Sequence, residues 1–199
     1  EHPVTENITG LDLVKEQIRI ANGEKLSFRQ EDLKIKGHSI EIRVCAEDPS
    51  NNFLPDIGTL ESYSIPQGPG VRVDDAYSEG MEIPIYYDPL IAKLIVFGKD
   101  RKEAIERMIR AIDDYRITGV NTTLGFCRFV MQHDAFVSGK FDTHFVKNHF
   151  KPEYLLSNNK DEMELAAILA VRMLRQRSVP LKNFSQSETI SNWKSNRLK

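Results

Sequence analysis

The sequence has 199 residues, which suits one domain, or one domain with part of another. Its hydrophobic share of 40% and charged share of 28% are ordinary for a globular protein. The net charge of −2 offers no basic field for nucleic acid or an acidic membrane surface, and no apolar run approaches the roughly 20 residues that span a bilayer. We therefore expect neither a nucleic-acid partner nor a membrane partner.

The start of the chain and its cysteines indicate its setting. The chain opens at Glu1 without a methionine, so we expect it to be a piece of a longer protein. Cys45 and Cys127 stand far apart in apolar contexts. This usage favours a reduced, intracellular setting over a disulfide framework.

The first helix is expected to follow an extended start. Pro3 biases His2 toward an extended conformation. Thr9 is expected to cap a helix that Gly23 ends. The apolar residues at helical spacing between these two positions are Leu11, Val14, Ile18 and Ala21.

Residues 40–46 alternate between aliphatic and other side chains, which predicts a strand with one buried face. The other face carries Glu41 and Arg43, and Asp48-Pro49 is expected to end the strand. Two interpretations of Arg43 remain open. On a rigid strand it can hold a planar anion by two hydrogen bonds, or it can simply face water.

Between Pro49 and Pro89 the chain is rich in glycine and proline, which predicts short strands and turns. Strands are expected over 59–65, 71–73 and 83–87, with 67–70 as a hairpin turn, and a buried strand over 90–97 that ends at Gly98. Lys93 in this last run is either a site residue or a lysine whose ammonium group reaches solvent at the strand's edge.

Helical patterns dominate the rest of the first 150 residues. Helices are expected from Asp100 to about Tyr115, from 124 onward with Asn121 or Thr122 as the cap, and over 143–150. His144 and His149 are five apart, and no carboxylate or cysteine completes a metal set, so no metal site is expected. Nucleophile-elbow, P-loop and G-x-G-x-x-G patterns are absent from the sequence.

The composition changes around residues 150–160, which is typical of a linker. Residues 163–174 then form an apolar helical pattern, and a polar segment follows to Lys199. We therefore expect two domains. Residues 1–150 form an α+β domain with a mainly antiparallel sheet flanked by helices, and 151–199 form a linker with the truncated start of a second domain.

Three stretches together resemble the biotin carboxylase family. Residues 1–10, which read E-H-P-V-T-E-N-I-T-G, are similar to the signature that ends its ATP-grasp part. Residues 41–49 resemble its E-C-R-x-x-A-E-D-P pattern, with Ile42 in place of the cysteine, and residues 86–94 are similar to its Y-Y-D-x-x-x-x-K-L run. Residues 98–122 fit its terminal helix and G-V-x-T-N region. The tail more weakly resembles the linking domain of acyl-CoA carboxylase alpha subunits.

The resemblance implies a reaction and roles for four residues. In the family, ATP phosphorylates bicarbonate, the carboxyphosphate yields carbon dioxide and phosphate, the phosphate takes the N1 proton of biotin, and biotin attacks carbon dioxide. Glu1 matches the glutamate that deprotonates bicarbonate, and Arg43 matches the arginine that contacts bicarbonate and stabilises the ureido oxyanion of biotin. Asp88 and Arg72 would have a structural or interface role.

The resemblance also implies cofactors and partners. Biotin is the cofactor, and ATP and Mg bind in the full-length enzyme through residues that precede Glu1. This segment would form the C-terminal wall of the active site, hold no metal and be inactive alone. The implied partners are further copies in an oligomer, a biotin carrier domain and a carboxyltransferase subunit, in the bacterial cytoplasm or, in a eukaryote, the mitochondrial matrix.

Three functions remain in competition. The leading hypothesis is an acyl-CoA carboxylase of the acetyl- or propionyl-CoA type, as used in fatty acid metabolism. Pyruvate carboxylase, which shares the same domain, is the alternative among enzymes. A non-catalytic interaction domain on the same scaffold is the alternative outside them.

Overall fold

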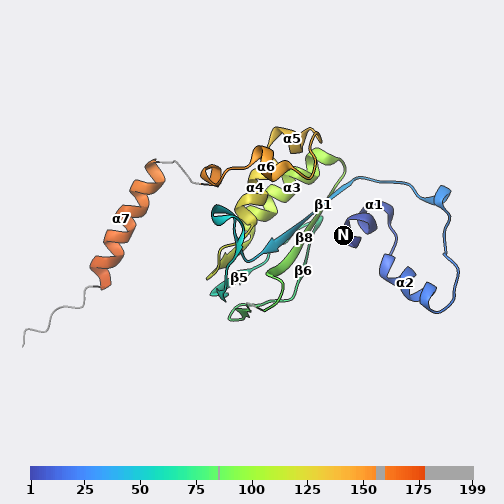
Figure 1. Ribbon diagram of the computed structural model, residues 1–199, viewed down its shortest axis with the longest axis horizontal. Helices are drawn as coiled ribbons and strands as arrows, with labels where there is room; N and C mark the ends of the chain where they lie inside the picture. Colours follow the sequence, from blue (N-terminus) through green and yellow to red (C-terminus); the bar gives the residue numbers. More distant parts are fainter. Residues whose placement is uncertain (85, 156–159, 178–199) are drawn as a thin grey trace, which may run out of the picture. The chain divides into compact units, whose positions relative to one another are not determined.

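The structure is a computed structural model that describes residues 1–84, 86–155 and 160–177. It divides into two compact units, Glu1–Leu156 and Ser157–Lys199. The helices and strands of the first unit are α1 (His2–Thr9), α2 (Leu13–Ala21), η1 (Gln30–Asp32), β1 (His38–Cys45), β2 (Glu47–Asp48), η2 (Pro49–Asn51), β3 (Leu54–Pro55), β4 (Gly58–Thr59), β5 (Ser62–Ser64), β6 (Val71–Asp75), β7 (Glu82–Ile83), β8 (Leu90–Gly98), α3 (Arg101–Asp114), β9 (Arg116–Thr118), α4 (Leu124–Gln132), α5 (Asp134–Val137), α6 (Phe145–His149) and η3 (Pro152–Leu155) (Figure 1). The described part of the second unit is α7 (Lys160–Arg177).

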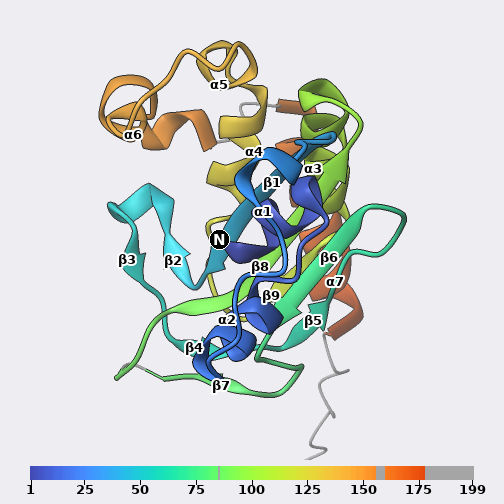
Figure 2. The ribbon, with the colours of Figure 1, turned by 90° about the vertical axis from the view of Figure 1, so that its right-hand side faces the viewer.

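The main sheet contains β1, β8 and β6, with β8 in the middle and antiparallel to both neighbours (Figure 2). Arg43 of β1 and Asp74 of β6 both lie opposite Lys93 of β8. The register shifts between Val44, which pairs with Ala92, and Cys45, which pairs with Leu90. The expected strands over 40–46 and 90–98 are confirmed, as is the α+β fold with a mainly antiparallel sheet.

Three smaller antiparallel pairs complete the strands: β2 with β3, β4 with β7, and β5 with β9. The prediction that residues 67–70 close a hairpin is wrong, because β5 pairs with β9 whereas β6 pairs with β8. The turn leads the chain onto β8, where the Phe97 amide donates to the Gly70 carbonyl at 2.9 Å. Contacts with a strand far along the sequence therefore decide what the turn connects.

Helix α3 covers one face of the main sheet and forms the apolar core with it. Asp100 caps this helix as expected, because its Oδ1 accepts a hydrogen bond from the Glu103 amide at 2.9 Å. The fully or almost fully buried members of the core include Val44, Leu94, Val96, Ala104, Met108 and Ala111. Burial of these side chains is the main stabilising contribution to this unit.

Helix α1 covers the opposite face, against β1 and β8 (Figure 2). The expectation of an extended start is wrong, because His2–Thr9 is helical. The first amides of a helix lack intrahelical partners, so Pro3 near its start loses no hydrogen bond and its fixed φ favours the helix. Pro3 is buried, and Ile95 of β8, also fully buried, lies on the face that α1 covers.

The caps of two further helices differ from the expected residues. Thr9 ends α1 and donates to the Thr5 carbonyl at 2.6 Å, and Asp12 caps α2 by accepting from the Lys15 amide at 2.9 Å. The N-cap of α4 is Thr123, rather than Asn121 or Thr122. Short-range propensity identified suitable residue types but missed the position, because the start of a helix depends on how its apolar face packs.

The remaining helix predictions are confirmed by α6 and α7. Helix α6 falls within the expected range 143–150, and α7 includes the apolar pattern of 163–174. Apolar side chains of α7, such as Ile168 and Leu174, are exposed. The polar segment expected from Gln176 to Lys199 lies almost entirely outside the described residues. In the part of the chain that the structure describes, no helix is long and apolar enough to cross a membrane.

Candidate functional site

A hollow of about 450 Å³ gathers four charged side chains on the face of the sheet that α1 covers. Its lining includes Glu1, Arg43, Asp88 and Lys93. The structure thus brings together three of the four site residues that the sequence singled out. These residues come from the N-cap of α1, from β1, from β8 and from the turn before β8, so the hollow forms only in the folded unit.

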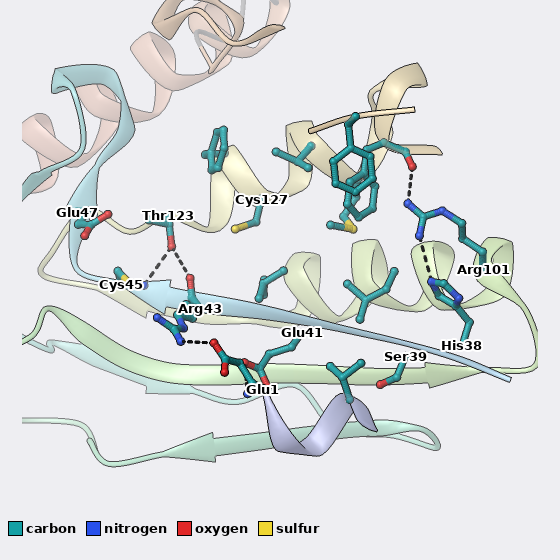
Figure 3. A pocket seen from close by; sticks show the side chains of 18 of the residues that line it. Glu1, His38, Ser39, Glu41, Arg43, Cys45, Glu47, Arg101, Thr123 and Cys127 are labelled. Carbon is teal, nitrogen blue, oxygen red and sulfur yellow. Dashed lines mark hydrogen bonds and ion pairs between the residues drawn. The ribbon is translucent and has the colours of Figure 1, made fainter. Parts of the chain in front are cut away.

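Glu1 and Arg43, which both line this hollow, form an ion pair with each other (Figure 3). Arg43 Nη2 lies 3.6 Å from Glu1 Oε1, and the two side chains are 61% and 90% exposed. Such an open ion pair contributes little to stability. It leaves both the carboxylate and most of the guanidinium donors accessible to a small ligand.

Asp88 and Lys93 line the same hollow from β8 and the turn before it. Asp88 Oδ1 accepts a hydrogen bond from the Leu90 amide at 2.9 Å, so this carboxylate shapes the turn that enters the strand. Lys93 is half-buried on the central strand, directly opposite Arg43. Because Lys93 lines the same hollow as Glu1 and Arg43, we favour the interpretation that it is a site residue. In the sequence, the only indication of this was its spacing of five residues from Asp88 in the Y-Y-D-x-x-x-x-K-L run.

Arg72 does not line the hollow. Its guanidinium binds Asp74 through two hydrogen bonds, of 2.7 and 2.9 Å, and Arg72 Nη1 lies 3.9 Å from Glu6 Oε2. The hydrogen bonds from Arg72 hold the pKa of Asp74 below its usual value. Arg72 therefore connects β6 with α1, the helix whose N-cap is Glu1.

A second, larger cavity of about 800 Å³ lies along the outer edge of β1 (Figure 3). Glu1 and Arg43 line this cavity as well as the smaller hollow. Its apolar lining comes mainly from α4, α5 and neighbouring loops and includes Phe53, Phe126, Val130, Met131, Phe136 and Phe141. The cavity is therefore apolar in its middle and polar at its two ends.

One polar end of the cavity contains Arg101 and His38, which the sequence did not single out. Arg101 Nη1 lies 3.1 Å from His38 Nε2, and its guanidinium carbon lies 4.7 Å from the centre of the Phe136 ring. Burial, and secondarily the charge of Arg101, lowers the pKa of His38. His38 is thus a neutral hydrogen-bond acceptor for Arg101 at neutral pH.

The other polar end contains Cys45, Glu47, Thr123 and Cys127. Burial raises the pKa of the Cys45 thiol to about 11 and that of the Cys127 thiol to about 12. Both therefore stay protonated at neutral pH and are poor nucleophiles. Burial and the nearby Asp88 carboxylate raise the pKa of Glu47. Nothing in this arrangement suggests thiol chemistry.

His144 and His149, the histidines considered as metal ligands, do not share a ligand set in the structure. His144 pairs with Asp142, whereas the His149 ring packs 4.7 Å from that of His133. Across the three described ranges, no three His, Cys, Asp or Glu side chains gather in a way that could hold a metal ion.

Comparison with known sequences identifies the family. The family called biotin carboxylase C-terminal domain matches residues 41–148, and the ATP-binding domain of the carbamoyl-phosphate synthase L chain matches residues 1–29. The chain is 52% identical to a pyruvate carboxylase subunit of Methanothermobacter thermautotrophicus over 149 residues, which are 75% of this chain and 30% of that protein. It is 50% identical to biotin carboxylase 1 of Bacillus subtilis over 149 residues, 75% of this chain and 33% of that protein.

Solved structures agree with these sequence matches. The biotin carboxylase domain of a thermophilic 2-oxoglutarate carboxylase, bound to bicarbonate, superposes with a TM-score of 0.74 at 49% identity. The match covers 78% of this chain and 35% of that one. The chain belongs to the biotin carboxylase family, and it spans about a third of the length of these relatives.

Proposed function

We propose that the protein carrying this chain is an ATP-dependent biotin carboxylase in which the chain supplies the C-terminal wall of the active site. The observation that carries the proposal is the meeting of Glu1 and Arg43 in a hollow that also contains Lys93. Biotin, when bound, supplies the ureido nitrogen that receives the carboxyl group, and ATP with Mg activates bicarbonate for that transfer.

The residues of the hollow fit an anionic substrate and a developing oxyanion. Glu1 is exposed and next to a cation, so as a carboxylate it can accept the proton of a bicarbonate held there. Arg43 presents a planar set of donors to a carboxylate-like anion or to the ureido oxygen. Lys93 places a second positive charge in the same hollow.

The activity is best tested on the full-length protein. We expect ADP formation that requires both bicarbonate and biotin, and we expect Glu1→Gln to lower kcat by about 100-fold or more, the usual range for loss of a general base. Glu24→Gln is the matched control, because Glu24 is an exposed carboxylate that lines neither cavity. Unchanged turnover in the folded Glu1→Gln enzyme would contradict the base role. Absence of bicarbonate- and biotin-dependent ADP formation by the unsubstituted full-length protein would favour a non-catalytic interaction domain.

The nucleotide is proposed to bind in the remainder of the protein. The match covers only 30–33% of the length of these relatives, and the ATP-binding family reaches only residues 1–29 here. We therefore expect the isolated chain to be inactive and to show no heat of Mg-ATP binding in calorimetric titration. A micromolar dissociation constant for the isolated chain would contradict this expectation.

We favour an acyl-CoA as the final acceptor. The match to the porcine propionyl-CoA carboxylase alpha chain, at 46% identity, covers 86% of this chain and 24% of that protein. A share of 86% corresponds to about 171 of the 199 residues. The first unit ends at Leu156, so the similarity extends into the second unit. This extent supports the interpretation of residues 151–199 as the start of a subunit-linking domain.

Pyruvate carboxylase remains the second candidate, because the pyruvate carboxylase subunit of Methanothermobacter thermautotrophicus is 52% identical over 149 residues. Assays of the complete enzyme with acetyl-CoA, propionyl-CoA, pyruvate and 2-oxoglutarate distinguish these acceptors. The proposed partners are further copies of the enzyme, a biotin carrier domain and a carboxyltransferase subunit. The proposed compartment is the bacterial cytoplasm, or the mitochondrial matrix in a eukaryote.

A further inference from the structure

The outer edge of β1 beside Arg43 is paired by a single residue instead of a strand. Among the described residues only β8 pairs with β1 as a strand, so the backbone groups on its other side need different partners. At the end of the strand these partners all belong to Thr123, which is 80 residues from Arg43 in sequence and only 6% exposed.

Three hydrogen bonds join Thr123 to this edge, and Figure 3 draws the two that its hydroxyl makes. The Thr123 hydroxyl donates to the Arg43 carbonyl at 3.0 Å and accepts from the Cys45 amide at 3.0 Å. The Thr123 amide donates to the Cys45 carbonyl at 3.1 Å. Both residues that flank Val44 are therefore fixed from the outside.

The use of the Thr123 hydroxyl is unusual for its position. Thr123 is the N-cap of α4, where a threonine side chain normally accepts a hydrogen bond from an amide in the first helical turn. Its hydroxyl makes no such cap bond and instead hydrogen-bonds to the backbone of β1. The contact also falls where it is most needed, because the register with β8 shifts between Val44 and Cys45.

We propose that Thr123 is a positioning residue for Arg43. The inference rests on the proposed function of Arg43 in the biotin carboxylase site. The Arg43 side chain is 61% exposed and its ion pair with Glu1 spans 3.6 Å, so side-chain contacts constrain it weakly. The position of the Arg43 guanidinium in the hollow therefore depends on the position of the β1 backbone, which Thr123 holds by hydrogen bonds.

The experiment compares Thr123→Val and Thr123→Ser in the full-length protein. Valine keeps the branched shape but removes the hydroxyl, whereas serine restores the hydroxyl. Thr122→Val is the matched control, because no hydrogen bond of the Thr122 hydroxyl is found within the described ranges. Amide hydrogen exchange at Cys45 reports on the contact itself, and kcat for biotin carboxylation, the KM for ATP and Tm report on its consequences.

We expect the Cys45 amide of Thr123→Val to exchange about tenfold faster or more, because its hydrogen-bond partner is lost. We expect kcat to fall about tenfold with an unchanged KM for ATP, since a small displacement of a catalytic group is costly. Thr123→Ser should stay within about twofold of the wild type in both measurements, and so should Thr122→Val.

A double variant separates positioning from a general structural role. If Thr123 acts through Arg43, Thr123→Val should lower kcat no further in an Arg43→Ala background. Additive losses of kcat, failure of serine to restore it, or unchanged Cys45 exchange would each overturn the proposal.

Absence of biotin carboxylation by the wild-type protein would refute the proposed function. The positioning role of Thr123 could still be tested without an activity assay. Relaxation of the Arg43 Nε–Hε group by NMR then reports whether Thr123→Val loosens the side chain. Greater mobility in Thr123→Val, restored by serine, would support the positioning role, and unchanged mobility would refute it.

Discussion

The two faces of the β1–β8–β6 sheet differ in what covers them. On the face that packs against α3, residues such as Val44, Leu94 and Val96 have no exposed surface. On the face that packs against α1, Arg43, Lys93 and Asp74 form a charged row across the three strands. Because successive residues of a strand point to opposite faces, stability and chemistry depend on alternate residues of the same strands.

The short helix α1 explains why the second face can hold a site. It buries Ile95 yet leaves the β1 end of the charged row open, with Glu1 beside Arg43. A longer covering helix such as α3 would exclude water and ligand alike. We therefore expect substitutions of core residues on the α3 face to change the free energy of unfolding, and substitutions of residues that line the hollow on the α1 face to change turnover.

The largest effect is expected from Leu94→Ala on the α3 face. Leu94 is fully buried in the core, so the lost contacts and the remaining cavity should lower the free energy of unfolding by about 2–5 kcal/mol. Urea denaturation measures this change, and kcat per folded molecule should stay close to that of the wild type. A large fall of kcat in fully folded Leu94→Ala protein would contradict the assignment of stability to one face of the sheet and turnover to the other.

Arg43→Ala tests the α1 face from the same sheet. If Arg43 stabilises the developing oxyanion, kcat for biotin carboxylation should fall about 10²–10³-fold, as for the loss of one oxyanion donor. Arg43→Lys should recover only part of this loss, because an ammonium group lacks the planar pair of donors. Thermal melting should change little, since the side chain is 61% exposed. Unaltered carboxylation by folded Arg43→Ala enzyme would leave β1 with a structural role alone.

Lys93→Met is expected to have a smaller effect on the same hollow. Loss of a partly exposed positive charge, worth about 1 kcal/mol, should raise the KM for bicarbonate roughly three- to tenfold. Comparison with the adjacent Leu94→Ala is informative, since the two residues lie on opposite faces. A destabilisation by Lys93→Met as large as that by Leu94→Ala would show that Lys93 serves mainly to pack the strand.

The smallest effect is expected from Asp74→Asn, and it should depend on pH. Arg72 lowers the pKa of Asp74 in the folded protein, so this carboxylate stabilises the fold above its ordinary pKa of 3.8. That contribution is lost as the pH falls through the lower, folded-state pKa. Because Arg72 and Asp74 are 47% and 29% exposed, we expect the variant to lose at most about 1 kcal/mol near pH 7. Urea denaturation at several pH values checks this, and a difference that grows on acidification would contradict it.

Local sequence patterns determined the elements that carry the site. The alternation over residues 40–46 predicted which residues of β1 are buried, and Asp100 with its following apolar face predicted α3. The motifs that begin with Glu1, Glu41 and Tyr86 identified the family, which the sequence and structure matches confirm. These signals are readable because a cap or a period depends on residues only a few positions apart.

Only the tertiary structure decided which of these elements meet. It placed the turn at 67–70 between two different sheets, Lys93 beside Glu1, and the hydroxyl of Thr123 on the backbone of Arg43 instead of on its own helix. Each of these outcomes depends on a partner that is distant in sequence. A single sequence specifies which hydrogen-bonding and charged groups need partners, but the partners are chosen by the packing of the whole unit.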